Sequence, residues 1–210
     1  MKRILIVDDH EVVRVGVKQV LNEQTGTAIF GEARASSEAL SLVREQDWDM
    51  VVLDLSLGDE SGLEVLKELK QLRPTLPVLI LSMHSEEQYA RRAFKAGAAG
   101  YVSKHSPRAE LVEALNKVAT GGKYVSSSLA EKLVVDLERG SDRLPHERLS
   151  DREFEVMRLI ALGKSVSDIA ELLSLSDKTV STYRARIFEK IRIHSNAELV
   201  RYAIENKLFE

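Results

Sequence analysis

Acidic residues follow two apolar runs of this 210-residue chain, and both runs are typical of buried β-strands. Asp8 and Asp9 come directly after residues 4–7, and Asp54 comes directly after residues 50–53. Because ligands of an open parallel sheet bind beyond the carboxyl ends of its strands, we expect these three carboxylates to lie together. Neighbouring carboxylates repel one another, and a cation bound between them relieves the repulsion. Mg²⁺ is suited to such a site because it prefers carboxylate, water and phosphate oxygens as ligands.

Two further polar residues belong to the same edge of the predicted sheet. Ser82 ends the apolar run that starts at residue 78, and Lys104 follows the run 100–102. A lysine offers a point charge to an anionic group, and a serine hydroxyl offers a hydrogen bond. A single Asp at a strand end is common in turns, so the five residues indicate a site only as a set.

The elements that position these residues alternate in type along the first half of the chain. Short β-rich runs occupy residues 4–7, 28–31, 50–53, 78–81 and 100–102, and helix-period segments occupy 11–23, 37–45, 62–72, 86–96 and 108–120. This alternation predicts βαβ crossovers and an α/β, doubly wound sheet of five parallel strands. Ser36 and Ser37 are expected to open the second helix, and Gly97 and Gly121 to end later ones.

The pattern changes after Tyr124, where no further strand run occurs. Residues 126–139 predict one more helix, and the polar stretch 140–148 predicts a linker. Four helical segments follow at 151–162, 166–173, 177–191 and 196–206, with Gly163 as a break and Ser176 as an N-cap. We therefore predict a first domain at 1–124, a helical linker at 125–148, and a small all-α, four-helix domain at 149–210.

Basic residues concentrate in one helix of the second domain, between residues 178 and 192. The order of helix, Gly break, short helix, turn and basic helix is that of a helix-turn-helix, whose second helix enters the major groove of DNA. The apolar side chains expected in its core are Ile169, Leu172, Leu173, Val180, Ile187 and Ile191. The residues expected to face DNA are Lys178, Thr179, Ser181, Thr182, Tyr183, Arg184, Ala185 and Arg186.

Composition excludes several classes of protein. The chain has no cysteine, so disulfides and thiolate chemistry are absent, and its net charge of −3 argues against a protein that coats nucleic acid uniformly. The N-terminal apolar run is too short for a signal peptide, and no run approaches the roughly 20 residues that span a bilayer. We expect a cytoplasmic protein with no membrane partner.

Several motifs of the first domain resemble the receiver domain of a two-component response regulator, which has a flavodoxin/CheY-like fold. They are VDDH at 7–10, VLDLSLGDESGLEVL at 52–66, LSMH at 81–84 and AGAAGYVSK at 96–104. The resemblance covers residues 1–124 and implies roles for individual residues. Asp54 would be the phosphoacceptor, Asp9 a direct Mg²⁺ ligand, Asp8 a ligand through water, and the Ser56 main-chain carbonyl a further ligand. Lys104 would pair with the acyl phosphate, Ser82 would bond its oxygen, and Tyr101 would swing inward.

Two positions depart from the pattern of that family. His105 follows Lys104 where the family often has a proline in a cis peptide, and Leu57-Gly58 replaces the family's Met-Pro pair.

The stretch LSDREFEVMRLIALGKSVSDIAELLSLSDKTVSTYRARIFEKI, residues 149–191, resembles the LuxR-type output domain. With the receiver-like first domain, the chain is identified as a member of the NarL/FixJ-type response regulators. The resemblance implies a sensor histidine kinase, homodimerisation on activation, double-stranded DNA and RNA polymerase as partners. It implies transcription regulation and no enzyme.

Two other functions compete with this interpretation. A phosphohydrolase with an Asp nucleophile uses a second acid two residues later, where this chain has Ser56. A regulator whose helical domain binds a protein would lack DNA affinity that depends strongly on salt. The histidines lack metal-ligand spacing, so we expect His10, His105, His146 and His194 at the surface. For His84, beside Ser82, we favour a place in the loop wall.

Overall fold

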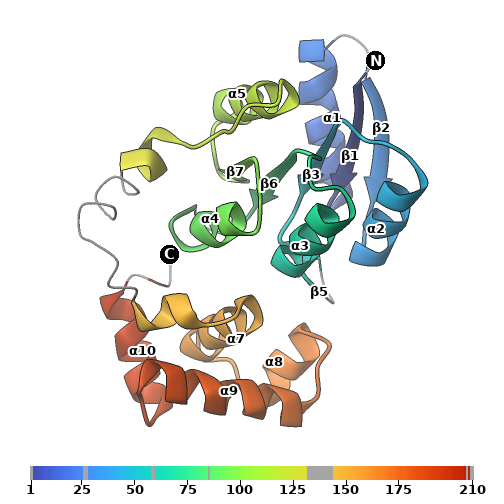
Figure 1. Cartoon of the computed structure of the whole chain (residues 1–210). Coiled ribbons are helices and arrows are strands. Elements are labelled where there is room, and N and C mark those ends of the chain that lie inside the picture. Colours follow the sequence, from blue (N-terminus) through green and yellow to red (C-terminus); the bar gives the residue numbers. More distant parts are fainter. Residues whose placement is uncertain are drawn as a thin grey trace. The chain divides into compact units, whose positions relative to one another are not determined.

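The chain divides into two units, Met1–Val135 and Asp136–Glu210, and the division falls inside the predicted linker (Figure 1). The computed structural model describes residues 2–25, 28–57, 60–84, 86–131, 144–206 and 208.

The first unit contains the predicted five-stranded parallel sheet, in the order β2-β1-β3-β6-β7. Its strands are β1 (Lys2–Val7), β2 (Ala28–Ala33), β3 (Met50–Leu53), β6 (Val78–Ser82) and β7 (Gly100–Ser103). The β-branched runs of β1, β3 and β6 are buried because helices cover both sides of a parallel sheet. β2 is an edge strand and is more exposed.

Five helices flank this sheet, as the alternation predicts. α1 (Glu11–Thr25) and α5 (Arg108–Ala119) lie on one face, and α2 (Ser36–Glu45), α3 (Gly62–Leu72) and α4 (Glu86–Lys95) lie on the other (Figure 1). The core under α1 and α5 takes alternate strand residues, such as Ile4 and Ile6 of β1. Ser36 and Ser37 open α2, as predicted, with Ala35 in the N-cap position and no side-chain cap.

The segment after α5 returns to the sheet. Gly121 ends α5 with a positive φ of 83°, and Tyr124 then forms a parallel bridge to Gly100 on β7. Ser126 accepts a hydrogen bond from the Leu129 N–H (3.2 Å) at the start of a helix whose described part is 127–131. Residues 132–143 of the predicted linker lie outside the described residues.

The second unit is a four-helix domain whose helix order agrees with the prediction. A short 3-10 turn, Pro145–Arg148, precedes α7 (Asp151–Ala161), α8 (Val166–Leu172), α9 (Asp177–Ile191) and α10 (Asn196–Glu205). α7 packs against α9 and α10, and α8 packs against α9. Each of the four helices starts with a serine whose side chain accepts a backbone N–H, because serine satisfies amide groups that a helix start leaves unpaired.

Gly163 separates α7 from α8 and has a φ of 81°, a left-handed conformation that favours glycine. Among the helices that the structure describes, none has the length and apolar character needed to cross a membrane.

Candidate functional site

The carboxyl ends of β1 and β3 bring the predicted acidic residues together. The Asp54 N–H donates to the Val7 carbonyl (2.9 Å), so β3 ends beside the point where β1 gives way to Asp8. Single ligand atoms of Asp8, Asp9, His10 and Asp54 all lie within 4.8 Å of one another. We call Asp8, Asp9 and Asp54 the acid cluster. Asp8 is 2% exposed and Asp54 is 1% exposed, whereas Asp9 faces solvent.

Lys104 is the cation of this site. Its Nζ lies 2.7 Å from Asp8 Oδ2 and 2.7 Å from Asp54 Oδ2, and its main-chain N–H donates to the Ser82 carbonyl (2.8 Å). Burial lowers the pKa of Lys104, but the bonds to both carboxylates outweigh burial and raise that pKa above its usual value. The lysine is therefore charged at neutral pH. No peptide bond of the described residues is cis, so the Lys104–His105 peptide is trans.

The Asp54 carboxylate is only half satisfied. Oδ2 accepts from Lys104, whereas Oδ1 is buried and has no hydrogen-bond partner among the residues that the structure describes. Burial raises the pKa of Asp54, although the bond from Lys104 and its charge lower it in part. A buried oxygen without a partner costs free energy unless a ligand completes it. Together with the oxygens of Asp8 and Asp9, it fits the ligand preference of Mg²⁺.

The loop after Asp54 forms a small hairpin that the sequence did not predict. β4 (Ser56–Leu57) pairs antiparallel with β5 (Glu60–Ser61), and α3 follows directly. Gly62 opens α3 against this loop, where a Cβ would lie 2.4 Å from the Leu55 Cα and 2.7 Å from the Asp54 carbonyl oxygen. Only glycine allows the chain to approach Asp54 so closely. The turn residues of the hairpin, 58 and 59, lie outside the described residues.

Ser82 and Tyr101 occupy the other side of the site, at β6 and β7. Both are completely buried. The Ser82 Oγ accepts from the His84 N–H (3.3 Å), and the Tyr101 hydroxyl donates to the His84 carbonyl (2.9 Å). Burial raises the pKa of the Tyr101 hydroxyl. Tyr101 therefore already points inward in this structure, and the inward swing that the family resemblance implies stays a prediction.

His84 packs into the loop wall, the role that the sequence favoured. Its ring stacks on Tyr89 at a centroid distance of 4.4 Å, and its Nε2 lies 3.3 Å from the Ser56 Oγ. His10 was expected at the surface, and its side chain is 66% exposed. The sequence nevertheless missed that its Nδ1 lies 2.6 Å from the Asp9 Oδ1, a proximity that its position directly after Asp9 could have indicated.

Most of the predicted DNA-facing residues of the second unit lie on the exposed side of α9. Lys178, Ser181, Thr182, Ala185 and Arg186 are exposed, and three further residues, Thr179, Tyr183 and Arg184, are half-buried. The Arg184 guanidinium lies 5.1 Å from the centroid of the Phe188 ring, which holds it along the helix. Val180, Ile187 and Ile191 are buried on the opposite side.

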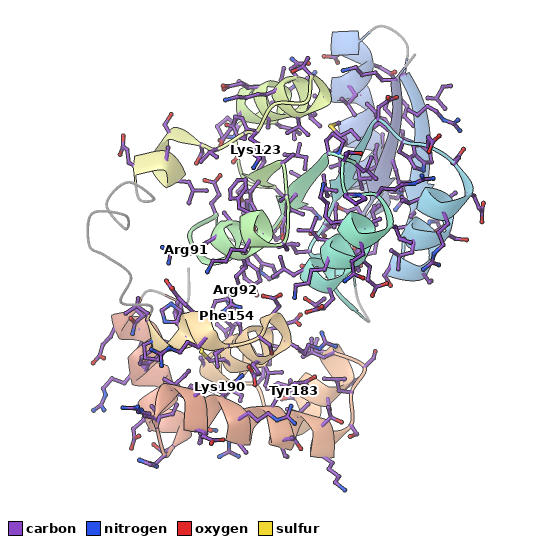
Figure 2. The ribbon with its side chains drawn as sticks, viewed as in Figure 1. Arg91, Arg92, Lys123, Phe154, Tyr183 and Lys190 are labelled. Atoms are coloured by element: carbon purple, nitrogen blue, oxygen red, sulfur yellow. The ribbon has the colours of Figure 1, made fainter. Side chains whose placement is uncertain are left out.

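One expectation for this unit needs correction, and one basic residue has a structural partner. Leu172 was predicted in the core, but it is 51% exposed because it is the last residue of α8, where the apolar stripe of the helix ends. Lys190 belongs to the basic stretch of α9, yet its side chain extends toward α7 (Figure 2) and bonds both oxygens of Glu153, at 2.9 and 2.6 Å. Lys190 therefore serves the domain core.

Two family descriptions match the chain. Residues 4–116 match the "Response regulator receiver domain", and residues 147–203 match "Bacterial regulatory proteins, luxR family". The chain is 35% identical to the response regulator UvrY of Escherichia coli (strain K12) over 209 residues, or 99% of this chain and 96% of UvrY. It is 34% identical to the response regulator GacA of Pseudomonas aeruginosa over 211 residues, or 100% of this chain and 99% of GacA.

Solved structures agree with these matches. RcsB from Salmonella enterica serovar Typhimurium, bound to a promoter in the presence of phosphomimetic BeF3⁻, has a TM-score of 0.67 and 25% identity, over 96% of this chain and 97% of RcsB. A LuxR-family response regulator from Aurantimonas sp. has a TM-score of 0.60 and 37% identity, over 65% of this chain and 97% of that one. The chain thus belongs to the NarL/FixJ-type two-component response regulators, with a receiver domain and a LuxR-type DNA-binding domain.

Proposed function

We propose that a sensor histidine kinase transfers a phosphoryl group to Asp54, and that the phosphorylated chain forms a homodimer that binds double-stranded DNA. Transcription is then regulated in the cytoplasm, through contact with RNA polymerase. The observation that carries this proposal is the half-satisfied Asp54 carboxylate, buried beside Lys104 with Oδ1 unpartnered within the described residues. The relatives named above are response regulators that the chain matches over nearly their whole length, which supports the proposal.

In the transfer, Asp54 Oδ1 attacks phosphorus and forms a new O–P bond while the P–N bond of the kinase phosphohistidine breaks. The electron pair stays on the departing imidazole, which takes up a proton. Lys104 stays bonded to Oδ2 and neutralises charge that develops on the phosphoryl oxygens. Asp54 is a suitable nucleophile because the bond and the charge of Lys104 favour its ionised form and so oppose the effect of burial, and aspartate carboxylates accept phosphoryl groups in ATPases.

Asp8, Asp9, Asp54 and the Ser56 main-chain carbonyl would hold a Mg²⁺ ion in this site. The acid cluster offers oxygen atoms within 4.8 Å of one another, and one of the buried oxygens lacks a partner in the part of the chain that the structure describes. When bound, the ion supplies positive charge to the phosphoryl oxygens. Lys104 alone leaves the three carboxylates with an excess of negative charge, so the residues present fit a divalent cation.

The signal would leave the site through Ser82 and Tyr101. A phosphoryl oxygen on Asp54 would accept from the Ser82 hydroxyl and draw the Oγ toward Asp54, away from the His84 N–H that now donates to it. The Tyr101 hydroxyl donates a hydrogen bond to the His84 carbonyl, so a shift of His84 would also move Tyr101 on β7. The β6–α4 loop and β7 therefore form the surface that changes on phosphorylation, and dimerisation uses the altered surface.

The second domain would bind DNA by placing α9 in the major groove. Lys178 and Arg186 are exposed on that helix, and Arg184 lies between them. In a dimer, two such helices reach half-sites about 34–36 Å apart. We propose no enzymatic turnover, because Ser56, two residues after Asp54, faces His84 and offers no second carboxylate.

The proposal is tested by phosphorylating the purified chain with acetyl phosphate and Mg²⁺, and by measuring its molecular mass and its affinity for a DNA duplex selected from a random pool. The wild type should dimerise and bind DNA more tightly, by about tenfold or more. Asp54→Asn is the control and should show neither change. Stoichiometric labelling of Asp54→Asn would overturn the assignment of the phosphoacceptor.

The DNA-binding face has a separate test. Arg184→Ala combined with Arg186→Ala should weaken DNA binding at all sequences and reduce the slope of affinity against salt by about two, because two counterion-releasing contacts are lost. Arg201→Ala on α10, where Arg201 pairs with Glu205, is the matched control for loss of a surface arginine. Unchanged affinity in the double variant, with native helical content, would remove α9 from the interface.

A further inference from the structure

Arg14 is a buried cation that the proposed phosphoryl transfer does not use. It lies one turn into α1, its side chain is only 2% exposed, and burying an arginine is costly unless its charge and hydrogen bonds are satisfied. Two acceptors satisfy it. The Arg14 Nε donates to Glu32 Oε2 on β2 (2.8 Å), and the Arg14 Nη1 donates to the main-chain carbonyl of Asp8 (2.8 Å).

The carbonyl that Arg14 binds belongs to the peptide that joins Asp8 to Asp9. A peptide unit is planar, so a bond to its oxygen orients the whole plane and sets the directions in which both acidic side chains leave the chain. The Asp8 N–H on the other side of the residue donates to the Ala33 carbonyl (3.1 Å). The acidic turn is thus held from its N-terminal side by β2 and from its C-terminal side by Arg14.

The side chain of Asp8 is held as well. Its Oδ1 accepts from the His10 N–H (2.8 Å) and its Oδ2 from Lys104 (2.7 Å). Among the described residues, no part of the sheet supports Asp9 in this way, and its carboxylate faces solvent beside His10. The backbone plane next to Asp9 therefore does more to position this exposed ligand than its side-chain contacts do.

We propose that Arg14 is a positioning residue for the divalent cation, which fixes the Asp8–Asp9 peptide so that the two carboxylates point at one ion. This role rests on the proposed function of the acid cluster as the Mg²⁺ site. Groups that orient metal ligands from outside the ligand shell commonly change metal affinity by about ten- to a hundredfold. Arg14 would likewise orient Asp8 and Asp9 without binding the ion itself.

The alternative role for Arg14 is a purely structural ion pair that joins α1 to β2. Glu32 separates the two roles, because it contacts Arg14 and Lys18 but no residue of the acid cluster in the contacts described. Glu32→Gln weakens the ion pair and leaves the Arg14–Asp8 bond in place. Arg14→Met removes both. A structural role predicts parallel effects of the two variants, and a positioning role predicts that only the Arg14 variant changes metal affinity.

The experiment is a calorimetric titration of the full chain with MgCl₂, together with thermal unfolding of each variant without metal. Arg14→Met should bind Mg²⁺ about tenfold more weakly than the wild type, and Glu32→Gln should stay within about twofold. Arg14→Lys keeps the charge but cannot span both acceptors, so its affinity should be intermediate; it carries the test if Arg14→Met does not fold.

Equal Mg²⁺ affinity in Arg14→Met, Arg14→Lys and the wild type would overturn the positioning role. So would weakening in Glu32→Gln that matches the Arg14 variants. Asp9→Asn distinguishes a failure of the proposed function. If wild type and Asp9→Asn give the same Mg²⁺ titration, the acid cluster is not the metal site, and the role of Arg14 is overturned together with it.

Discussion

Each domain has a buried carboxylate paired with a lysine: Asp54 with Lys104 in the receiver domain, where Asp8 shares the lysine, and Glu153 with Lys190 in the DNA-binding domain. The Glu153 pair is complete, because both oxygens bond Lys190 and Oε2 also accepts the Ser150 N–H (2.7 Å). The Asp54 pair is incomplete, because Oδ1 has no partner among the described residues.

The pKa values of the two acids follow this difference. Burial raises the pKa of both carboxyls, but for Glu153 the bonds from Lys190 and Ser150 outweigh burial, and its pKa falls below the ordinary value. For Asp54, burial prevails and the pKa is raised. A carboxylate whose two oxygens are both bonded stabilises the fold, whereas a carboxylate with one unbonded oxygen can bind a ligand.

The largest effect is expected for Lys104→Met. Without this lysine, the phosphoryl group on Asp54 loses its cation, so the gain in DNA affinity after acetyl phosphate should fall from about tenfold to less than about twofold. Phosphate-affinity electrophoresis measures the labelled fraction, and fluorescence anisotropy measures DNA binding. Lys67→Met, which removes a lysine exposed on α3 and paired with Glu64, is the control. If Lys104→Met gains DNA affinity after acetyl phosphate as strongly as the wild type, Lys104 takes no part in the switch.

The second effect concerns stability. Glu153→Gln should lower the free energy of unfolding of the DNA-binding domain by about 2 kcal/mol, because Lys190 and the Ser150 N–H lose a charged acceptor. Asp54→Asn should leave the receiver domain unchanged or stabilise it by up to about 1 kcal/mol, because an incompletely paired buried charge is removed.

Urea unfolding measures both domains in one sample. Trp48, the single tryptophan of the chain, reports the receiver domain by fluorescence, and far-UV circular dichroism follows both domains. Destabilisation of the receiver by Asp54→Asn as large as that of the other domain by Glu153→Gln would contradict the contrast between the pairs.

The third effect is a pH dependence of opposite sign in the two domains. The folded pKa of Glu153 is lowered from 4.5, so its stabilising effect is present above that value and is lost as the pH falls through the folded pKa. The folded pKa of Asp54 is raised from 3.8, so its favourable effect is present below that value and is lost as the pH rises through the folded pKa. In acid, wild type should therefore lose its advantage over Glu153→Gln and gain stability relative to Asp54→Asn. Urea midpoints at pH values from neutral to about 3 measure the stability of wild type relative to each variant. If both differences change in the same direction as the pH falls, the opposite pKa shifts of Glu153 and Asp54 are refuted.

The smallest effect is expected for Tyr101→Phe, which removes a completed bond inside the unfinished site. Loss of the hydroxyl bond to the His84 carbonyl should cost the receiver about 1 kcal/mol, without reducing the fraction of Asp54 labelled by acetyl phosphate. Trp48 fluorescence in urea measures the stability of the receiver domain, and phosphate-affinity electrophoresis measures the labelled fraction of Asp54. A loss of labelling would place Tyr101 in the transfer itself.

Most of the fold and the acid cluster could be predicted from the sequence. The spacing of apolar residues determines the helices and strands, and the strand ends determine where the acidic residues lie. Buried β-branched runs mark parallel strands, and residues directly after such runs must reach the same edge, as Asp8 and Asp54 do. The core of α9 followed from helical spacing in the same way, with Val180 and Ile187 buried as expected.

Side-chain partners across elements could not be predicted. No pattern in the sequence marks Arg14 or Lys190 as the partner of a distant carboxylate, and only the three-dimensional contacts show these ion pairs. The β4–β5 hairpin has too few residues to give a periodic signal, and Leu172 lies at a helix end, where the apolar stripe no longer determines burial.

The bridge between Tyr124 and Gly100 matters for protein engineering. β7 is the last strand in the sheet order, and Tyr124 donates its N–H to the Ala99 carbonyl (2.8 Å), which covers part of an otherwise open edge. A chimera that attaches a different output domain after residue 126 keeps this cover. A junction before residue 124 would uncover β7 and offer unpaired backbone groups to another chain, which favours edge-to-edge aggregation.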